Sequence, residues 1–275
     1  MTLAHGEDEW QTIKYPGLGI EIRAALNRPM REITDNVRIN CKRGLPQVWP
    51  CEPKTKDGDL NTQVLAICAG GPSLAESIDK IKESKRNGAK VVALAGAAKY
   101  LIKNGVVPTA HVLLDSRVGN VGFISDIDCQ YFVASQCDPA VFDALKDRRV
   151  MIWHAINGDK DVEAIEESYE KWVPVAGGNT IALRSLRLFQ ILGYHRFELF
   201  GFDSCILNGK HHAYKQEAAD ETETKDIMFN KKKFTVTAWQ IQQAMEFQKM
   251  VKTFGQDWEI ICHGDGLIAE MIKGA

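Results

Sequence analysis

Residues 64–74 read VLAICAGGPSL, an apolar run that passes directly into the glycine pair Gly70 and Gly71 and then into a helical pattern over Leu74 to Arg86. The apolar run shows no alternation with polar residues. Such a run is typical of a strand that is buried on both faces of a parallel sheet. This stretch therefore predicts an α/β fold in which a glycine turn connects a central strand to its helix.

The rest of the chain from Gln63 onward repeats this alternation. Short runs rich in Val, Ile, Leu and Phe predict strands, and amphipathic patterns between them predict helices. The expected strands are Val64 to Cys68, Lys90 to Ala95, His111 to Asp115, Tyr131 to Ala134, Val150 to His154, Arg196 to Gly201 and Trp258 to Cys262. The expected helices are Leu74 to Arg86, Ala97 to Asn104, Ala140 to Lys146, Val162 to Glu170, Thr180 to Leu192 and Ala238 to Thr253. A mostly parallel sheet with helices on both faces follows.

The N-terminal quarter of the chain differs from the rest. Helical patterns around Ile20 to Leu26 and Met30 to Cys41 are followed by a segment that contains three prolines. We therefore expect residues 1–62 to form a small N-terminal helical appendage and linker, and residues 63–275 to form the main domain.

Charge and composition limit the classes of partner. The 275 residues include 34 basic and 36 acidic side chains, which excludes the strongly basic surface of a dedicated nucleic-acid binder. The apolar runs are too short to span a bilayer, and the segment MTLAHGEDEW lacks a signal pattern, so we expect a cytoplasmic protein with small-molecule partners.

The seven cysteines are scattered and odd in number, which favours reduced thiols.

The turn formed by Gly70, Gly71, Pro72 and Ser73 is the first candidate site. A glycine turn that opens a helix suits a phosphate, because the first N–H groups and the positive end of the helix dipole face the ligand. The alternative is a structural turn, since Ser73 and Glu76 have the spacing of a capping box that binds nothing. The turn is neither a Walker A loop nor a G-x-G-x-x-G motif.

A second turn of the same kind lies in PVAGGNTIAL, residues 174–183. Gly177 and Gly178 precede a helix, with Asn179 or Thr180 as its expected N-cap. Two such helix openings in one sheet are more than folding requires, and they predict a bound anion.

An acid and an imidazole follow the strand at Arg196 to Gly201. In FGFDSCILNGKHHAY, residues 200–214, Asp203 is expected at the carboxyl end of the strand, and His211 and His212 lie in the same loop. A carboxylate and an imidazole that converge can bind a metal, activate a hydroxyl or relay a proton. The alternative is a pair of surface histidines without a catalytic role.

Asp115 in HVLLDSR also lies at the expected end of a strand. It would take a ribose hydroxyl or a metal, or it would only cap a turn. Alternatively, the functional group of this segment is Arg117, as a phosphate clamp. Residues 214–233 carry clustered acidic and basic side chains, and are expected as a solvated loop or as a lid over the site.

Four blocks in this order are similar to the 6-hydroxymethylpterin diphosphokinase MptE-like family. These blocks are VLAICAGGPSL, the segment from Val91 to Asp115, VPVAGGNTIALRSLRLFQIL and FGFDSCILNGKHHA, and together they cover about residues 63–214. The first turn also resembles that of family 42 sialyltransferases, which use CMP-sugars. The sequence departs from the commoner G-x-GPSL opening of the family by reading AGGPSL.

The resemblance implies a Rossmann-like domain that acts on a nucleotide-linked substrate. It implies that Gly70, Gly71, Pro72 and Ser73 lie near the nucleotide together with Gly177, Gly178 and Asn179. It also implies catalytic roles for Asp203, His212 and Asp115, with Asp115 and Asp203 arranging a Mg²⁺ ion.

The preferred hypothesis is a transferase that moves diphosphate from ATP to a small hydroxyl acceptor with the help of Mg²⁺. One alternative is a glycosyltransferase that uses a CMP-sugar or another nucleotide sugar. A second alternative is a nucleotide-binding module without catalysis. A homo-oligomer is compatible with each of the three.

Overall fold

The computed structural model describes residues 10–15, 20–25, 28–52, 61–215 and 223–273. Its centre is an eight-stranded sheet in which every pair of neighbouring strands is parallel. The mostly parallel α/β sheet expected from the sequence is thereby confirmed. Its strands are β3 (Val64–Cys68), β4 (Lys90–Leu94), β5 (Ala110–Leu113), β6 (Gln130–Ala134), β7 (Val150–Ala155), β8 (Pro174–Val175), β9 (Arg196–Phe200) and β12 (Glu259–Cys262).

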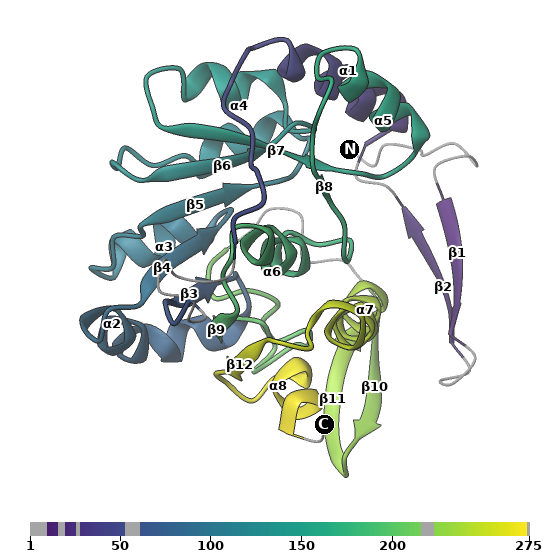
Figure 1. Ribbon diagram of the computed structural model, residues 1–275. Helices are drawn as coiled ribbons and strands as arrows, with labels where there is room; N and C mark the ends of the chain where they lie inside the picture. The colour runs from purple at the N-terminus through teal and green to yellow at the C-terminus, as the bar shows by residue number, and fades with distance from the viewer. Residues whose placement is uncertain (1–9, 16–19, 26–27, 53–60, 216–222, 274–275) are drawn as a thin grey trace.

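The strand order places the middle of the fold at β3. The order is β12-β9-β3-β4-β5-β6-β7-β8, so the chain first builds outward from β3 in one direction and then returns to add β9 and β12 on its other side (Figure 1). The order reverses between β3 and β9. In open α/β sheets, ligands bind outside the carboxyl ends of the strands at such a switch point.

Helices cover both faces of the sheet. Leu65 and Ile67 of β3 belong to the core that includes Leu186 of α6, whereas Ala66 and Cys68 belong to the core that includes Ile81 of α2. Alternate side chains of one strand thus enter opposite layers, as expected for a strand without a solvent-facing side. The helices are α1 (Met30–Cys41), α2 (Ile78–Arg86), α3 (Ala97–Lys103), α4 (Pro139–Ala144), α5 (Asp159–Glu166), α6 (Ile181–Ile191), α7 (Ala238–Phe254) and α8 (Leu267–Lys273), with 3₁₀ turns at η2 (Pro72–Ser77) and η3 (Val118–Phe123). Within the described segments, no helix combines the length and the apolar character needed to cross a bilayer.

The N-terminal region contains one element that the sequence interpretation assigned wrongly. The segment expected as a helix around Ile20 to Leu26 forms strand β2 (Ile20–Ala25), which pairs with β1 (Trp10–Tyr15) in an antiparallel hairpin. The order IEIR at its start alternates apolar and polar residues, which is the period of a strand. The helix over Met30 to Cys41 is confirmed as α1, and it packs against α5.

The expected loop at residues 214–233 is also partly regular. Strand β10 (Thr224–Phe229) pairs with β11 (Lys232–Thr237), and both turn residues, Asn230 and Lys231, have positive φ. Two consecutive residues with positive φ are typical of the tight turn that matches the twist of a hairpin. Residues 216–222 lie outside the described segments, and a lid role for this region stays a prediction.

Candidate functional site

The first glycine turn lies at the carboxyl end of β3, at the point where the strand order reverses. The N–H of Gly71 donates to the carbonyl oxygen of Gly201, which follows β9, over 3.0 Å. A Cβ atom at Gly71 would clash with that carbonyl oxygen and with Oδ2 of Asp203. Glycine is therefore required here because two loops approach each other through their backbones.

Asp203 holds the start of the helix that follows this turn. Its side chain is only 2% exposed, and its Oδ2 accepts the N–H of Ser73 over 2.8 Å. Burial raises the pKa of Asp203, and the hydrogen bond from Ser73 opposes this rise. Asp203 thus supplies the negative group at the N-terminus of η2. The capping box considered for Ser73 and Glu76 is not formed, because no side chain of the turn caps η2.

The amide groups of this turn are largely engaged within the protein. Gly71 donates to Gly201, Ser73 donates to Asp203, and Leu74 donates to the carbonyl oxygen of Gly71 over 3.1 Å. Pro72 has no N–H to offer. The donors that a phosphate cradle would use at this turn therefore already have internal partners.

His212 lies beside the same turn. Its Nδ1 is 3.3 Å from the carbonyl oxygen of Gly70. A carbonyl oxygen can only accept, so this contact places the proton on Nδ1 and the lone pair of the neutral ring on Nε2. In this tautomer Nε2 is the acceptor atom of the ring.

Tyr214 joins the His212 loop to the turns after β3 and β4. Its ring stacks on His212 with centroids 6.2 Å apart and lies 5.8 Å from the ring of Tyr100. A Cβ atom at Gly70 would lie 2.6 Å from the Tyr214 hydroxyl, and one at Gly96 would lie 2.9 Å from the Tyr214 ring. Glycines at the ends of two neighbouring strands thus leave room for one aromatic side chain.

Asp115 lies at the same edge of the sheet but in a separate arrangement. Its Oδ2 is 2.9 Å from Nε of Arg117, and its Oδ1 accepts the backbone N–H of Arg117 over 3.0 Å. The side chain of Asn120 donates to the carbonyl oxygen of Asp115. These contacts are those of a turn that its own aspartate stabilises, the alternative that the sequence left open.

The two aspartates do not form a shared metal site. Asp115 follows β5 and Asp203 follows β9, and these strands are three positions apart in the sheet. At about 4.8 Å per strand, this separation is about 14 Å, whereas Mg²⁺ requires oxygen ligands at roughly 2 Å. Among the residues that the structure describes, no three His, Cys, Asp or Glu side chains are grouped to hold a metal ion. Asp115 and Asp203 therefore do not fit the predicted Mg²⁺ ion, and no catalytic step is assigned to such an ion.

The second glycine turn opens α6 as predicted, with Thr180 as its N-cap. Gly177 and Gly178 both have positive φ, which explains the glycine pair. The N–H of Asn179 donates to the Glu246 carboxylate of α7 over 2.9 Å. A carboxylate of the protein thus takes one of the donors proposed for a nucleotide phosphate.

The sequence interpretation did not identify two groups of side chains at the carboxyl edge of the sheet. Tyr214 ends the quoted block around His212, and its position after two histidines was the available signal. Arg184 on α6 is buried and donates to Asn157 Oδ1 over 3.0 Å, and Asn157 donates to Gln136 Oε1 over 2.8 Å. This polar chain links loops that follow β6 and β7, and no sequence motif marks it.

Comparisons with known proteins agree with this architecture. A family model described as 6-hydroxymethylpterin diphosphokinase MptE-like matches residues 34–209, which is more than half of the chain. The comparison with curated proteins finds no match. Among solved structures, the MAf glycosyltransferase from Magnetospirillum magneticum AMB-1 is similar, with a TM-score of 0.66 and 17% sequence identity over 86% of this chain. The chain spans 36% of the length of that protein, and at this identity the likeness shows the fold alone.

Proposed function

Because the chain belongs to the 6-hydroxymethylpterin diphosphokinase MptE-like family, we propose that it is a transferase whose site lies at the switch point between β3 and β9. The substrates would be a nucleotide-linked donor and a small molecule with a hydroxyl group. The proposal concerns the group of residues that the structure brings together at this point. They are Gly70, Gly71, Ser73, Asp203, His212 and Tyr214.

The observation that carries this proposal is the orientation of His212. With Nδ1 directed at the Gly70 carbonyl oxygen, Nε2 of the neutral ring carries the lone pair needed by a general base. In the proposed reaction, Nε2 takes the proton of the acceptor hydroxyl while that oxygen attacks the donor. The new bond forms at the hydroxyl oxygen, and the bond to the departing nucleotide phosphate breaks.

Asp203 would be a positioning residue in this mechanism. Its carboxylate is buried and fixed to the Ser73 N–H, so it holds the glycine turn against the loop that leads to His212. A site in which the reacting groups are held in one geometry lowers the barrier chiefly through proximity and orientation. Tyr214 and Tyr100 add an aromatic surface next to the turn, which suits a nucleobase or a sugar ring.

Two donors are candidates for this site, and the separation of Asp115 from Asp203 supports a nucleotide sugar over ATP. Glycosyl transfer from a nucleotide sugar can proceed with a base and a charge-stabilising environment. Diphosphoryl transfer needs a divalent ion to neutralise the developing charge, and Asp115 and Asp203 do not converge to hold one. The fold likeness to a glycosyltransferase is compatible with this order of preference. The diphosphokinase reaction is the second candidate, because the family description names it.

A thermal-shift panel separates the two donors. The protein is heated with CMP, UDP, CDP or ATP, each with Mg²⁺ and with EDTA. A ligand present at about 100 times its Kd stabilises the folded state by about 2.7 kcal/mol, which gives a measurable rise in Tm. We expect a rise with a nucleoside mono- or diphosphate that EDTA does not remove. A rise with ATP alone that EDTA abolishes would favour the diphosphokinase reaction instead.

A pair of neighbouring histidines provides the catalytic test. His212→Ala should reduce transfer by about 10²- to 10⁴-fold, the range of a lost general base, while nucleotide binding persists. His211→Ala is the matched control and should retain activity within a few fold. If both variants bind nucleotide and the unmodified protein shows no turnover with any donor, the chain is a binding module that lacks catalysis.

A further inference from the structure

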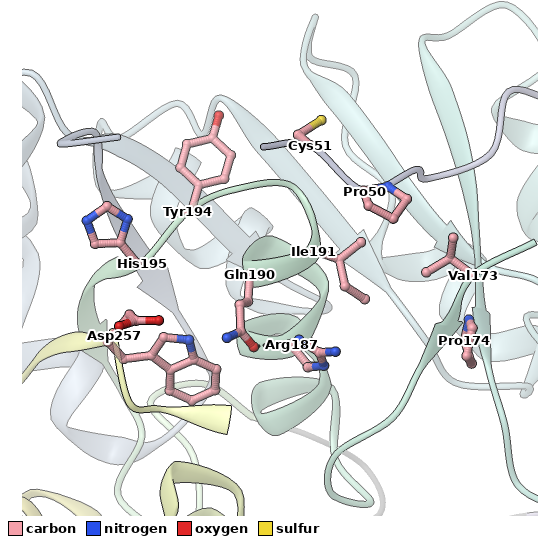
Figure 2. Close-up of a pocket in the computed structure, with 11 residues that line it drawn as sticks. Pro50, Cys51, Val173, Pro174, Arg187, Gln190, Ile191, Tyr194, His195 and Asp257 are labelled. Atoms are coloured by element: carbon pink, nitrogen blue, oxygen red, sulfur yellow. Dashed lines mark hydrogen bonds between the residues drawn. The ribbon is translucent and has the colours of Figure 1, made fainter. Parts of the chain in front are cut away.

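A cavity of about 450 Å³ is lined by residues of α6 and of the segments that precede β8, β9 and β12 (Figure 2). His195 and Trp258 line it, and they directly precede β9 and β12. The cavity is therefore at the amino ends of these strands, whereas the proposed transferase site is at the carboxyl ends. The C-terminal half of α6 forms its floor. This cavity plays no part in the proposed function.

Its size and walls resemble those of a small-molecule site. Pockets for small ligands have volumes of roughly 300–1,000 Å³ and mostly apolar walls with a few polar groups. Here Ile191 of α6, Val173 and Pro174 at β8, and the indole ring of Trp258 supply apolar surface. A ligand with an apolar body would remove this surface from water, at a gain of about 25 cal/mol per Å².

Arg187 supplies a positive charge within these walls. Its guanidinium lies 4.6 Å from the centre of the Phe254 ring, and its Nη1 donates to Gln190 Oε1 over 2.6 Å. Among the described residues it has no carboxylate partner within ion-pair distance. Partial burial lowers the pKa of Arg187, and no neighbouring charge opposes this change. A partly desolvated cation without a counter-charge favours an incoming anion.

Two further polar atoms in the lining have no hydrogen-bond partner within the described part of the chain. These are Nε1 of Trp258 and Nδ1 of His195, and both are buried. The His195 side chain is only 6% exposed. Buried polar atoms in native proteins are nearly always paired, so two unpaired ring nitrogens make the walls of this cavity polar as well as apolar.

We propose that this cavity is a second ligand site, and that it binds a small carboxylate with an apolar body. The carboxylate would pair with Arg187, and the apolar part would lie against Trp258 and Ile191. Figure 2 shows Arg187 between Pro174 on one side and Asp257 with His195 on the other. The negative charge of Asp257 disfavours the opposite orientation, because it would repel the carboxylate at that end.

Two probes that differ only in charge test the proposal. The intact protein is titrated with 3-phenylpropionate and with its neutral amide, 3-phenylpropanamide, by saturation-transfer NMR. The carboxylate should bind at least about tenfold more tightly, the difference made by about 1.4 kcal/mol of charge-dependent binding. Arg187→Gln should abolish this preference. Arg148→Gln removes an arginine that lies between α4 and β7 and pairs with Asp126, and it should leave the preference unchanged.

A second variant covers the case in which Arg187→Gln does not fold. Trp258→Phe keeps an aromatic ring but removes the indole N–H and part of the apolar ring surface, and it should weaken binding of 3-phenylpropionate several fold. The proposal is overturned if the acid and the amide bind equally or if Arg187→Gln retains the preference. It is also overturned if neither probe has a Kd below about 10 mM, which corresponds to a binding free energy of about 3 kcal/mol. None of these results depends on transferase activity, so failure of the proposed function would leave this test intact.

Discussion

At the scale of single residues, the glycine at position 71 is explained by neighbouring atoms and not by its backbone dihedrals. Gly71 has φ −62°, a value that any residue adopts. Glycine is needed at this position because the Gly201 carbonyl and the Asp203 carboxylate occupy the space of a Cβ atom. Glycine at position 71 thus permits the close approach of the loops that follow β3 and β9.

This packing predicts the effect of adding one methyl group. Gly71→Ala should lower the free energy of unfolding by about 1–3 kcal/mol, the usual cost of overpacking, since both opposing groups are held in place. Gly119→Ala is the control, because no heavy atom lies within 4 Å of its Cβ position, and it should change stability by less than about 0.5 kcal/mol. Urea unfolding monitored by circular dichroism measures both, and equal stabilities would contradict the packing argument.

Two buried histidines predict how stability depends on pH. Burial lowers the pKa of His111 and of His154 from 6.5 to about 4 in each case. The unfolded chain therefore binds more protons between pH 4 and 6.5, and stability falls as the pH is lowered through that window. The raised pKa of Asp203 has the opposite sign and partly offsets this loss in acid.

At pH 5 each of the two histidines should lower the free energy of unfolding by at most roughly 2 kcal/mol relative to pH 7. The difference between the urea unfolding midpoints at pH 7 and pH 5 measures their summed effect. Imidazole NMR resonances report the protonation of each ring, and the signals of His111 and His154 should not titrate above pH 5. A midpoint that is the same at both values would show that these rings are not held neutral by burial.

At the scale of elements, helix α7 is fixed at its start by a complete capping box. The Thr237 side chain accepts the N–H of Gln240, and the Gln240 side chain accepts the N–H of Thr237. Both Thr237 and Gln240 are buried. Because Glu246 of α7 binds the second glycine turn, this cap also helps to hold that turn in place.

Loss of this cap has a defined cost. Thr237→Ala should lower the free energy of unfolding by about 1 kcal/mol, as expected for an N-cap threonine. Thr253→Ala, near the C-terminal end of the same helix, removes an exposed hydroxyl that bonds only to the Lys249 carbonyl oxygen, and should cost less than about 0.5 kcal/mol. Similar losses for the two variants in chemical denaturation would argue against the capping role.

At the scale of the whole molecule, burial on both faces of the sheet determines which thiols can react. All seven cysteines are free, and Cys51 is exposed, whereas Cys262 is partly buried and the remaining five are buried. Burial raises the pKa of Cys262 to about 12 and that of Cys205 to about 11, which keeps both as unreactive thiols.

The native protein should therefore show one rapidly reacting thiol with a disulfide reagent such as DTNB, and seven in denaturant. Cys51→Ser should remove the rapid phase and leave the slow phase in place. Two or more rapid thiols in the unmodified protein would mean that the layers over the sheet open more readily than their packing indicates.

The sequence by itself determined the class of fold, most of the strands and helices, and the glycine turns at the helix openings. These features depend on local periodicity and on the few residues that tolerate tight turns, so they can be read along the chain. The exceptions were strands β1, β2 and β8 and the hairpin of β10 and β11, whose runs are too brief for periodicity to decide.

Only the tertiary structure decided which side chains meet. Asp203 and Ser73 are 130 residues apart in sequence and bonded in space, whereas Asp115 and Asp203 look equivalent in sequence but follow strands that are three places apart. The order of strands in the sheet sets these distances, and strand order depends on contacts between segments that are remote in the chain. No local pattern records it, and for that reason the contact of His212 with Gly70 and the roles of Glu246 and Tyr214 emerged only from the folded chain.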